Sequence, residues 1–539
     1  MSSPWPRLRP VGDAALTVEL GDHIDAEINA RVQALDRALA RDPFPGCREA
    51  VPSYRSLLVV YDPVVTPFEE ACRRVTQLAS APPVPREGRR HVIPVRYGGE
   101  DGPDLPSVAA ACGLSPSQVV ALHTSHDYTA FMLGFLPGFA YLGLLPEALH
   151  TPRRATPRVR VPAGSVGITG PQTGVYPSLS PGGWNLLGRT SWRPFEAHGH
   201  PPARIAPGDR VRFEAVDVLS EEPPPSTPAA LGTAVVEVLD PGALTLVQDA
   251  GRPGWRRCGV SAGGALDLPA LVAANACVGN PAHAAGLECT LTGPTLRFLA
   301  TRRFALAGAD LGAVLHRADL GAWPVPSGMP VLGRAGNVLA FTARRSGCRA
   351  YLALAGGVDV PLLLGARATD LSGRFGGLHG RPLQAGDRLG LGDPAPGRVE
   401  HGDVPAALPV SPLSVRVVLG PQEDHFTPAA RRALLESEYE ISATSDRVGC
   451  RLRGRRLEHA AGAEIVSDGM VPGCIQVPPD GQPIIMLGGG PTTGGYPKIA
   501  TVITRDVPLL GQMVPGEGRV RFEVLTVTEA QGLWRSART

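Results

Sequence analysis

The sequence predicts a mainly β protein with some α-helix, in which a small N-terminal α+β unit precedes three β-barrels. Short apolar segments between Gly/Pro-rich turns fill most of the 539 residues, and 65 glycines and 56 prolines supply those turns. This pattern is typical of closed all-β architectures. The same order of turn, tyrosine segment and Gly-Asp-Arg closing strand also recurs along the chain, which indicates related barrels.

The N-terminal unit is expected over residues 1–84. Apolar periodicity predicts a strand at 11–20, a helix at 25–40 with one apolar face, and a buried strand at 56–61. The sequence TPFE at 66–69 reads as a capping box with proline at the first helical position, so a second helix is expected to follow it.

The three barrels are expected after a linker at 81–90. The first spans 91–219, the second 233–400 and the third 411–530, and a Pro-rich linker at 220–232 separates the first from the second.

The barrel repeat is carried by matching segments. VPAGSVGI (161–168), QTGVYP and APGDRVRF in the first barrel are matched by VPPDGQPIIM (477–486), PTTGGYP and VPGEGRVRF in the third. GCRAYLALAGG and QAGDRLGLG form a weaker copy in the second. A Ser-Pro pair opens a helix in the first barrel, and helices are expected at 268–278 and after the Thr-Pro cap at 427–428 in the later copies.

The composition excludes several classes of function. A net charge of +2 gives no electrostatic case for a nucleic-acid or membrane partner. No apolar run reaches the ~18 residues of a membrane helix and the N-terminus lacks an apolar signal core, so a cytoplasmic protein is expected. Nine scattered cysteines without a Cys-x-x-Cys pair read as isolated thiols in a reducing compartment. Lys498 is the only lysine, which excludes a Walker-type phosphate loop.

The stretch 131–190 has the strongest signature of a binding surface. GFLPGFAYLG places aromatic side chains among tight turns, PRRATPRVRVPAG adds four arginines, and SPGGW ends in a rigid turn. A guanidinium suits phosphate or carboxylate, so the stretch predicts a site for a small anionic or amide-bearing ligand. The same turns also suit the corners of β-barrels, which is the purely structural alternative for each residue.

The candidate site residues are polar and aromatic side chains held at turns. The sequence has no Gly-x-Ser-x-Gly elbow between a strand and a helix, no His-Glu-x-x-His and no Gly-x-Gly-x-x-Gly after a strand. The pairs His123/His126 and His198/His200 lack a supporting set of carboxylates, so no metal ligands are predicted. A buried Asp or Gln at a glycine turn often bonds the turn itself. The candidates in the first half are His123, Phe139, Arg154, Arg158, Gln172, Tyr176, Trp184 and Arg189, and those in the second half are Asp249, Arg252, Asn275, Asp446, Arg447, Gln476, Thr493 and Tyr496.

Several of these motifs resemble a known pair of proteins. GFLPGFAYLG, TGVYP and SPGGW resemble the B subunit of 5-oxoprolinase, also called allophanate hydrolase subunit 1. QDAGRPG, LECTLTGP, GCIQVPPDGQP and TTGGYPKIATVI resemble the C subunit of that enzyme, or allophanate hydrolase subunit 2. The chain looks like a fusion of the two over nearly its whole length. The resemblance implies that the barrels are cyclophilin-like.

The resemblance also implies an activity, the ATP-dependent opening of 5-oxoproline to glutamate with a separate A subunit of the LamB/YcsF-like type. ATP with Mg²⁺ would be the co-substrate. Arg154, Arg158 and Arg189 are then expected to clamp phosphate or carboxylate, with Arg158 essential for turnover. Asp249 and Asp446 are expected to serve in proton or metal work, and the other candidates to bind substrate or nucleotide. Similar proteins often carry Asp and Gln just before TTGGYP, where this chain has Gly489 and Pro491.

Two other functions stay open from the sequence. The same domains resemble the carboxyltransferase part of urea carboxylase, but the chain has no Met-Lys-Met segment and is expected to carry no covalent biotin. Relatives that act as a histidine-kinase inhibitor and its antagonist suggest a non-enzymatic regulatory module instead. A homo-oligomer is left open as well.

Overall fold

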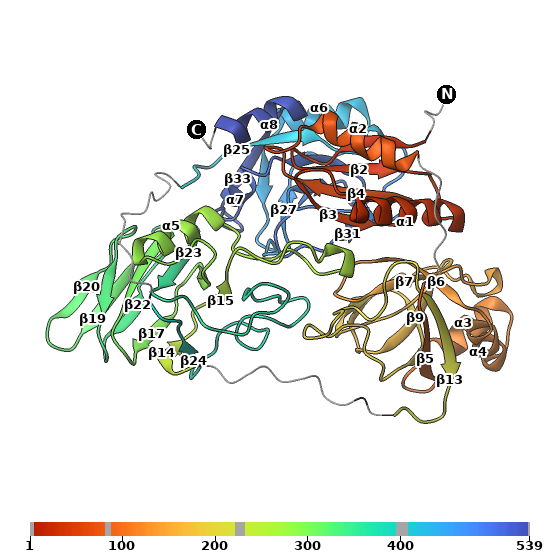
Figure 1. The fold of residues 1–539 in the computed structure, drawn as a ribbon, viewed down its shortest axis with the longest axis horizontal. Coiled ribbons are helices and arrows are strands. Elements are labelled where there is room, and N and C mark those ends of the chain that lie inside the picture. The colour runs from red at the N-terminus through yellow and green to blue at the C-terminus, as the bar shows by residue number, and fades with distance from the viewer. Residues whose placement is uncertain (1–4, 81–87, 221, 223–231, 395–407, 537–539) are drawn as a thin grey trace.

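The computed structural model describes residues 5–80, 88–220, 222, 232–394 and 408–536. Four units are visible: an N-terminal α+β unit, a first barrel, a middle unit of two sheets, and a C-terminal barrel (Figure 1). Most of the expected linkers at 81–90 and 220–232 lies outside the described residues. Within the described ranges no single helix is long and apolar enough to cross a membrane.

The N-terminal unit is a four-stranded antiparallel sheet covered by two helices. The first helix begins after Asp25, whose carboxylate accepts hydrogen bonds from the backbone N–H groups of Glu27 (2.8 Å) and Ile28 (2.9 Å). The expected capping box at 66–69 is wrong, because the Thr66 hydroxyl donates to Pro45 O instead (2.5 Å) and the helix begins one residue later than expected. The sheet order is β1 (Arg7–Pro10), β2 (Ala15–Glu19), β4 (Ser56–Tyr61), β3 (Cys47–Pro52), and the helices are α1 (Ala26–Arg41) and α2 (Phe68–Ala79).

The first barrel is closed by seven strands, with two helices at one end (Figure 1). Its first and last strands pair in parallel, and the predicted Ser-Pro helix is confirmed, with a full capping box between Ser115 and Gln118. The order is β5 (Arg90–Tyr97), β12 (Asn185–Arg189), β9 (Ser165–Thr169), β10 (Gln172–Val175), β7 (Ala140–Gly143), β6 (Tyr128–Leu133), β13 (Arg210–Ala215); outside it lie α3 (Leu105–Cys112), α4 (Pro116–Thr124), the 3₁₀ turn η1 (Glu147–Leu149) and the ribbon of β8 (Arg158–Val161) and β11 (Ser180–Gly182).

The C-terminal barrel has the same circular strand order as the first. Its first and last strands again pair in parallel, which confirms that the two barrels are related. The order is β25 (Leu413–Leu419), β32 (Lys498–Val502), β29 (Cys474–Gln476), β30 (Ile484–Met486), β27 (Gly449–Arg453), β26 (Tyr439–Ile441), β33 (Arg519–Val524), with α6 (Pro428–Glu436), α7 (Val507–Leu510), α8 (Val527–Ser536), η3 (Glu423–His425) and the ribbon of β28 (Asp468–Gly469) and β31 (Thr493–Gly494).

This shared order corrects one detail of the expected repeat. VPAGSVGI covers the end of β8 and most of β9, and its topological equivalents are β28 and β29. The matching segment is therefore VPGCIQ (471–476), and not VPPDGQPIIM (477–486), which forms the following turn and strand.

The middle unit differs from a third closed barrel because its strands form two separate sheets that enclose one apolar core. The expected helix at 268–278 is confirmed and packs on the five-stranded sheet. One sheet has the order β20 (Gly321–Pro324), β19 (Ala313–Arg317), β22 (Val338–Phe341), β17 (Thr295–Phe298), β14 (Ala234–Asp240), β24 (Arg388–Gly390); the other has the order β15 (Leu244–Gln248), β16 (Gly286–Thr290), β23 (Ser346–Leu354), β18 (Arg302–Asp310), β21 (Val331–Gly333), with α5 (Leu268–Val278) and η2 (Arg256–Cys258).

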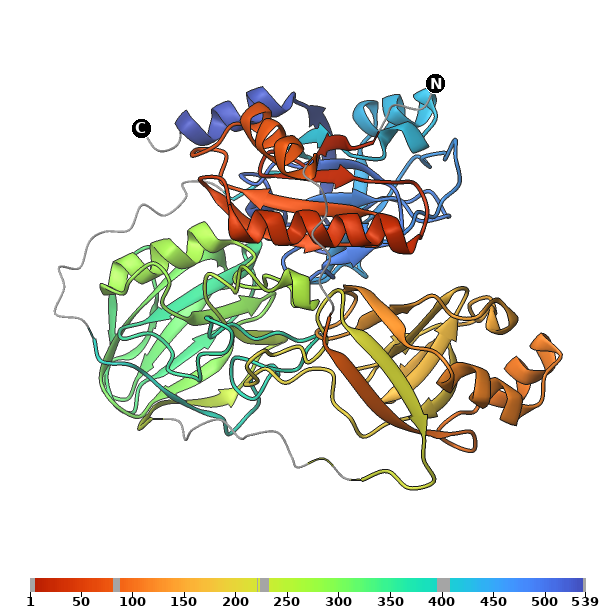
Figure 2. The same ribbon diagram turned by 45° about the vertical axis from the view of Figure 1, so that its right-hand side comes forward.

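The N-terminal unit docks on the C-terminal barrel, at the far end of the chain (Figures 1 and 2). Asp13 accepts hydrogen bonds from the Thr504 hydroxyl (2.9 Å) and the Trp534 indole N–H (2.6 Å). Gln531 donates to Asp13 O and to the Tyr61 hydroxyl (both 2.9 Å). Both ends of the described chain therefore belong to one packed assembly.

A buried ion pair lies inside this interface. The single lysine, Lys498, is 0% exposed, and its Nζ lies 3.3 Å from the Asp468 carboxylate. Ser56 of the N-terminal unit donates to the same carboxylate (2.5 Å), as does the backbone N–H of Gly469 (2.8 Å). Burial raises the pKa of Asp468, but Lys498, Arg55 and these hydrogen bonds outweigh it, so the net pKa is lowered and the carboxylate is charged.

We expect Asp468→Asn to cost about 3 kcal/mol of the free energy of unfolding, because it leaves the Lys498 ammonium buried without a counter-charge. The matched control is Asp424→Asn, which breaks the exposed Arg9–Asp424 pair and should cost less than about 1 kcal/mol. Urea unfolding of both variants measures the difference, and equal losses would contradict the role assigned to Asp468.

Candidate functional site

The loop 134–139 of the first barrel is one of the places where the two halves of the chain meet. Its Gly138 N–H donates to Cys258 O of the middle unit (2.8 Å). A Cβ at Gly134 would collide with the Thr493 hydroxyl of the C-terminal barrel. Phe135 in the same loop has φ +64°, a strained value for a residue with a side chain. The predicted binding stretch is thus held from both sides.

A buried aromatic cluster lies behind this loop. Phe139 packs edge-on against Tyr141, Tyr176 and Trp184, with ring centroids 4.9, 5.2 and 5.3 Å away. Tyr54 of the N-terminal unit joins the cluster 6.0 Å from Tyr141, and its hydroxyl is buried without a hydrogen-bond partner. Burial raises the pKa of Tyr176 to about 12, so its phenol is neutral. The structure therefore brings together the predicted Phe139, Tyr176 and Trp184, but as a packed core.

The predicted arginines of the first half do not share one position. Arg154 and Arg158 both donate to the carboxylate of Asp104 at 2.8 Å, and Asp104 also accepts from Leu186 N–H (2.8 Å). Burial raises the pKa of Asp104, but Arg158 and the other donors lower it further, so it stays ionised. Arg189 lies exposed at the end of β12 and donates to Ala163 O (3.1 Å). Asp104 was not among the predicted residues, because it precedes α3 and looks like an ordinary helix cap.

His123 lies inside the first barrel and not on a surface. It is 0% exposed and stacks on Phe213 at 4.6 Å. Its two ring nitrogens lie 2.7 Å from the Tyr97 hydroxyl and 2.8 Å from the Thr173 hydroxyl. Burial lowers the pKa of His123 to about 3, which keeps the imidazole neutral. This position corrects the expectation of a ligand contact, because both nitrogens are used within the barrel.

The two predicted catalytic aspartates hold turns. Asp249 accepts hydrogen bonds from the backbone N–H groups of Gly251 (2.8 Å) and Arg367 (2.6 Å). Asp446 accepts from Val448 N–H (2.8 Å) and Gly449 N–H (3.2 Å). Both carboxylates thus make the local bonds that such residues favour at turns.

Arg447 belongs to a buried network between the middle unit and the C-terminal barrel. It pairs with Glu288, which is 0% exposed, and donates to Gly264 O (2.7 Å). The Tyr351 hydroxyl donates to the same Glu288 carboxylate (2.9 Å), and Arg349 lies 3.7 Å away. Burial lowers the pKa of Arg447 to about 10, so the guanidinium keeps its charge near neutral pH.

The remaining predicted residues are distributed over both halves. Thr493 is buried and hydrogen-bonds Tyr141 across the junction, while Gln476 packs against Met470. Asn275 is fully buried and donates to Ala284 O (2.9 Å). Half-buried positions are occupied by Gln172, at the start of β10, and by Tyr496.

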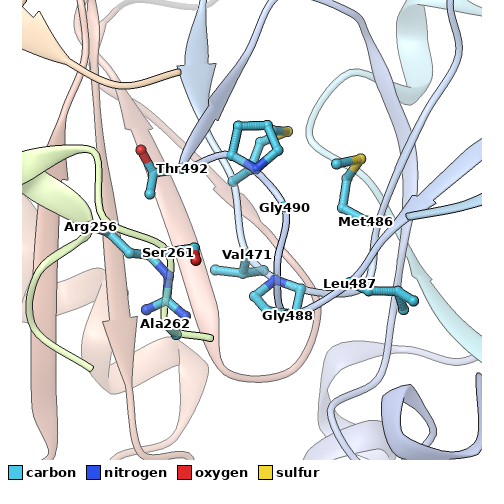
Figure 3. A pocket seen from close by; sticks show the side chains of 12 residues that line it. Arg256, Ser261, Ala262, Val471, Met486, Leu487, Gly488, Gly490 and Thr492 are labelled. Carbon is cyan, nitrogen blue, oxygen red and sulfur yellow. The ribbon is translucent and has the colours of Figure 1, made fainter. Parts of the chain in front are cut away.

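A small pocket lies where the middle unit, the C-terminal barrel and the N-terminal unit meet (Figure 3). Arg256 lines it from the middle unit, and its guanidinium and backbone N–H both donate to Glu49 of β3 at 2.6 Å. Gly490, Pro491 and Thr492 line it from the C-terminal barrel, so the place where this chain departs from similar proteins falls in this pocket. The cavity of about 10 Å³ has room for one water at most. As it stands, this pocket is too small for a nucleotide.

Metal ligands do not gather in the part of the chain that the structure describes. No group of three or more His, Cys, Asp or Glu side chains is placed there to hold an ion. All nine cysteines are free.

Two family matches define the class of protein. Residues 6–205 match the carboxyltransferase domain, subdomain C and D, and residues 258–524 match the carboxyltransferase domain, subdomain A and B. The chain therefore belongs to the carboxyltransferase-domain family and carries both parts in one polypeptide.

Its relatives in this family include separate proteins for the two halves. The second half is 40% identical to the 5-oxoprolinase C subunit of Escherichia coli (strain K12) over 296 residues, 55% of this chain and 93% of that protein. The first half is 46% identical to the 5-oxoprolinase B subunit of Escherichia coli O157:H7 over 204 residues, 38% of this chain and 93% of that protein. Urea amidolyase of Lachancea kluyveri is 32% identical over 56% of this chain but only 17% of its own length.

A solved structure has both halves in the same arrangement. The crystal structure of TTHA0988 superposes with a TM-score of 0.83 at 38% identity, and the match covers 96% of this chain and 100% of that chain. Urea amidolyase of K. lactis superposes with a TM-score of 0.50 at 30% identity over 57% of this chain and 20% of its own.

We expect the buried His123 to make the protein less stable in acid. The pKa of His123 is about 3 in the folded protein and about 6.5 in the unfolded chain. Its contribution to the free energy of unfolding is therefore complete above pH 6.5 and is lost as pH falls toward 3. Between pH 7 and pH 5 the decrease in the free energy of unfolding should be about 2 kcal/mol smaller in His123→Gln than in the wild type. Urea unfolding at both pH values measures it. The exposed His126→Gln is the control and should behave as the wild type; an unchanged loss in His123→Gln would be evidence against a neutral core imidazole.

Proposed function

We propose that this chain is the fused B and C component of a 5-oxoprolinase, which opens the cyclic amide 5-oxoproline to glutamate with ATP and a separate A component. One observation carries the proposal: each half matches a different 5-oxoprolinase component over 93% of that component's length. The interface between the halves contains buried hydrogen bonds from Ser56 to Asp468 and from Thr504 to Asp13. Fusion makes this contact intramolecular. It therefore raises the effective concentration of each half near the other and favours their association.

The chemistry requires donors that are fixed in place. A lactam carbonyl is a poor electrophile, and transfer of a phosphoryl group from ATP to its oxygen makes the ring carbon open to attack by water. Negative charge then accumulates on phosphoryl oxygens, and preorganised cations lower the barrier. In this proposal Mg²⁺ arrives bound to ATP.

Arg158 and Arg154 are the proposed anion clamp. They already hold one carboxylate, that of Asp104, in a geometry that suits a bidentate guanidinium. A bound phosphate or carboxylate would exchange with Asp104 or extend this cluster. Arg189 stays in the proposal as an exposed cation that is nearby in the sequence. Asp249 and Asp446 stay in it as groups that handle protons, which requires that their hydrogen bonds to the turn backbone first break.

Carboxyl transfer is the second candidate, and similarity to urea amidolyase favours it. The chain could then act only on carboxybiotin carried by another protein, because its one lysine is 0% exposed and paired with Asp468. Regulation of a histidine kinase stays a prediction from the sequence.

The purified chain together with the A component should release glutamate from 5-oxoproline only when ATP is present, and neither protein should do so alone. The assay measures glutamate and ADP together. The complete mixture could instead release no glutamate, and the chain could carboxylate an amide when a biotin carboxylase and a biotin carrier are supplied. That result would contradict the proposal and favour the carboxyltransferase.

Arg158→Ala should lower ATP-dependent turnover by about 100-fold or more, because one charge-stabilising donor typically contributes that much. Arg160→Ala is the matched control: Arg160 lies exposed on the same strand and its loss should change turnover less than about threefold. Thermal unfolding of both variants separates lost chemistry from lost structure, since Arg158 also bonds Asp104. Equal turnover in the two variants would remove Arg158 from the clamp.

A further inference from the structure

The ribbon formed by β8 and β11 lies outside the first barrel and has an unpaired edge. β8 pairs with β11 on one side, and in the part of the chain that the structure describes no strand pairs with its other side. Pro157 and Pro162 flank β8, so the backbone N–H groups along it belong to the four residues Arg158–Val161. An edge of this kind presents backbone donors and acceptors to an extended segment of another protein.

The side chains along this edge are cationic. From residue 148 to residue 195 the chain contains six arginines and neither aspartate nor glutamate. Arg189 reaches the end of β8, because its Nε donates to Ala163 O (3.1 Å). At the other end, the backbone N–H of Arg154 donates to Gly183 O beside β11 (2.9 Å). The arginines on or beside β8 are Arg153, Arg154, Arg158, Arg160 and Arg189.

Most of this positive charge has no counter-charge among the described residues. Asp104 pairs with Arg154 and Arg158 (both 2.8 Å), and within the described ranges no other carboxylate pairs with these five arginines. Five positive charges against one negative charge leave a surplus of four. Such a field attracts an acidic partner and speeds its association.

The charge also decides which strand can pair with β8. A second copy of the chain would place the arginines of one β8 against those of the other, and like charges across a strand pair are destabilising. A segment that carries aspartate or glutamate would place opposite charges there. Val159 adds an apolar contact between Arg158 and Arg160, since 84% of its surface is exposed, the largest fraction among the large apolar side chains of the described residues.

We propose that the edge of β8 is the docking surface for an acidic, extended segment of the A component. Val159 would pack against this segment, and Arg153, Arg160 and Arg189 would face its carboxylates. The inference rests on the proposed function, which supplies the partner and places its anion clamp, Arg154 and Arg158, on the same ribbon. Docking at this edge brings the A component next to the clamp.

The test measures the affinity of the purified full-length chain for the A component by biolayer interferometry. Val159→Glu places a negative charge in the middle of the edge and should weaken binding by about tenfold or more. Val159→Thr keeps a β-branched side chain and should change the affinity by less than about threefold. Val218→Glu is the matched control, because Val218 follows β13 with 78% of its surface exposed, and it should leave the affinity unchanged.

A second set of measurements tests the charge. The affinity should fall by about tenfold or more between about 50 and about 300 mM NaCl, because salt screens exposed charges. Arg153→Glu combined with Arg160→Glu reverses two charges outside the clamp, so it should weaken binding by about tenfold or more and reduce the dependence on salt. Arg160→Ala alone should change the affinity by less than about threefold, because one exposed ion pair contributes little.

The outcomes of these measurements are distinct. Binding that salt and Val159→Glu weaken, and that Val218→Glu leaves unchanged, supports the surface. Absence of binding by the wild type, equal affinity in Val159→Glu, or an affinity independent of salt overturns it. A single-stranded DNA oligonucleotide that binds as tightly as the A component and displaces it also overturns the proposal, since the edge would then be a nucleic-acid surface.

Turnover separates this surface from the proposed function. Glutamate release at a limiting concentration of the A component should be lower in Val159→Glu than in the wild type. Equal release in the two proteins would refute the docking surface and keep the function. Weaker binding in Val159→Glu, together with no glutamate from the complete wild-type mixture, would support the surface and refute the function.

Discussion

The docking of the N-terminal unit on the C-terminal barrel is the constraint on which the rest of this structure depends. Asp13 is buried within it and accepts hydrogen bonds from Thr504 and Trp534 of the C-terminal barrel. Asp468 is buried there too, with Ser56 on one side and Lys498 on the other. Because these two segments lie more than 400 residues apart, their contact closes the chain on itself. The first barrel and the middle unit are then held beside each other, and the loop 134–139 becomes one of the places where the two halves meet.

Local features of the fold could be predicted from the sequence, and distant ones could not. The helices after Ser115 and Thr427 and at 268–278 follow from caps and spacing, which act within a few residues. The relation between the two closed barrels follows from repeated turn segments. The failed cap at Thr66 shows the limit, since its hydroxyl finds Pro45, a partner 21 residues away. The two-sheet form of the middle unit likewise depends on which strand edges meet.

The candidate site was predictable as a region but not as a set of roles. The stretch 131–190 contains Phe139, Tyr176 and Trp184, which the structure brings together, yet spacing cannot show that Tyr54 joins the same cluster. Spacing also cannot show that Asp104 accepts hydrogen bonds from Arg154 and Arg158, or that the His123 side chain lies inside the first barrel. Arg252 was identified by its turn, but spacing cannot show that its guanidinium is buried beside Phe375 and Asp370, which only the fold brings next to it.

The solitary lysine gives this molecule an unusual chemical property. Acylating and reductive-alkylation reagents target side-chain amines, and here the sequence offers them a single one, enclosed between β32, the carboxylate of β28 and the sheet of the N-terminal unit. Its modification requires that interface to open. The rate at which the label is incorporated would therefore follow the transient opening of this contact, with no engineered reporter residue.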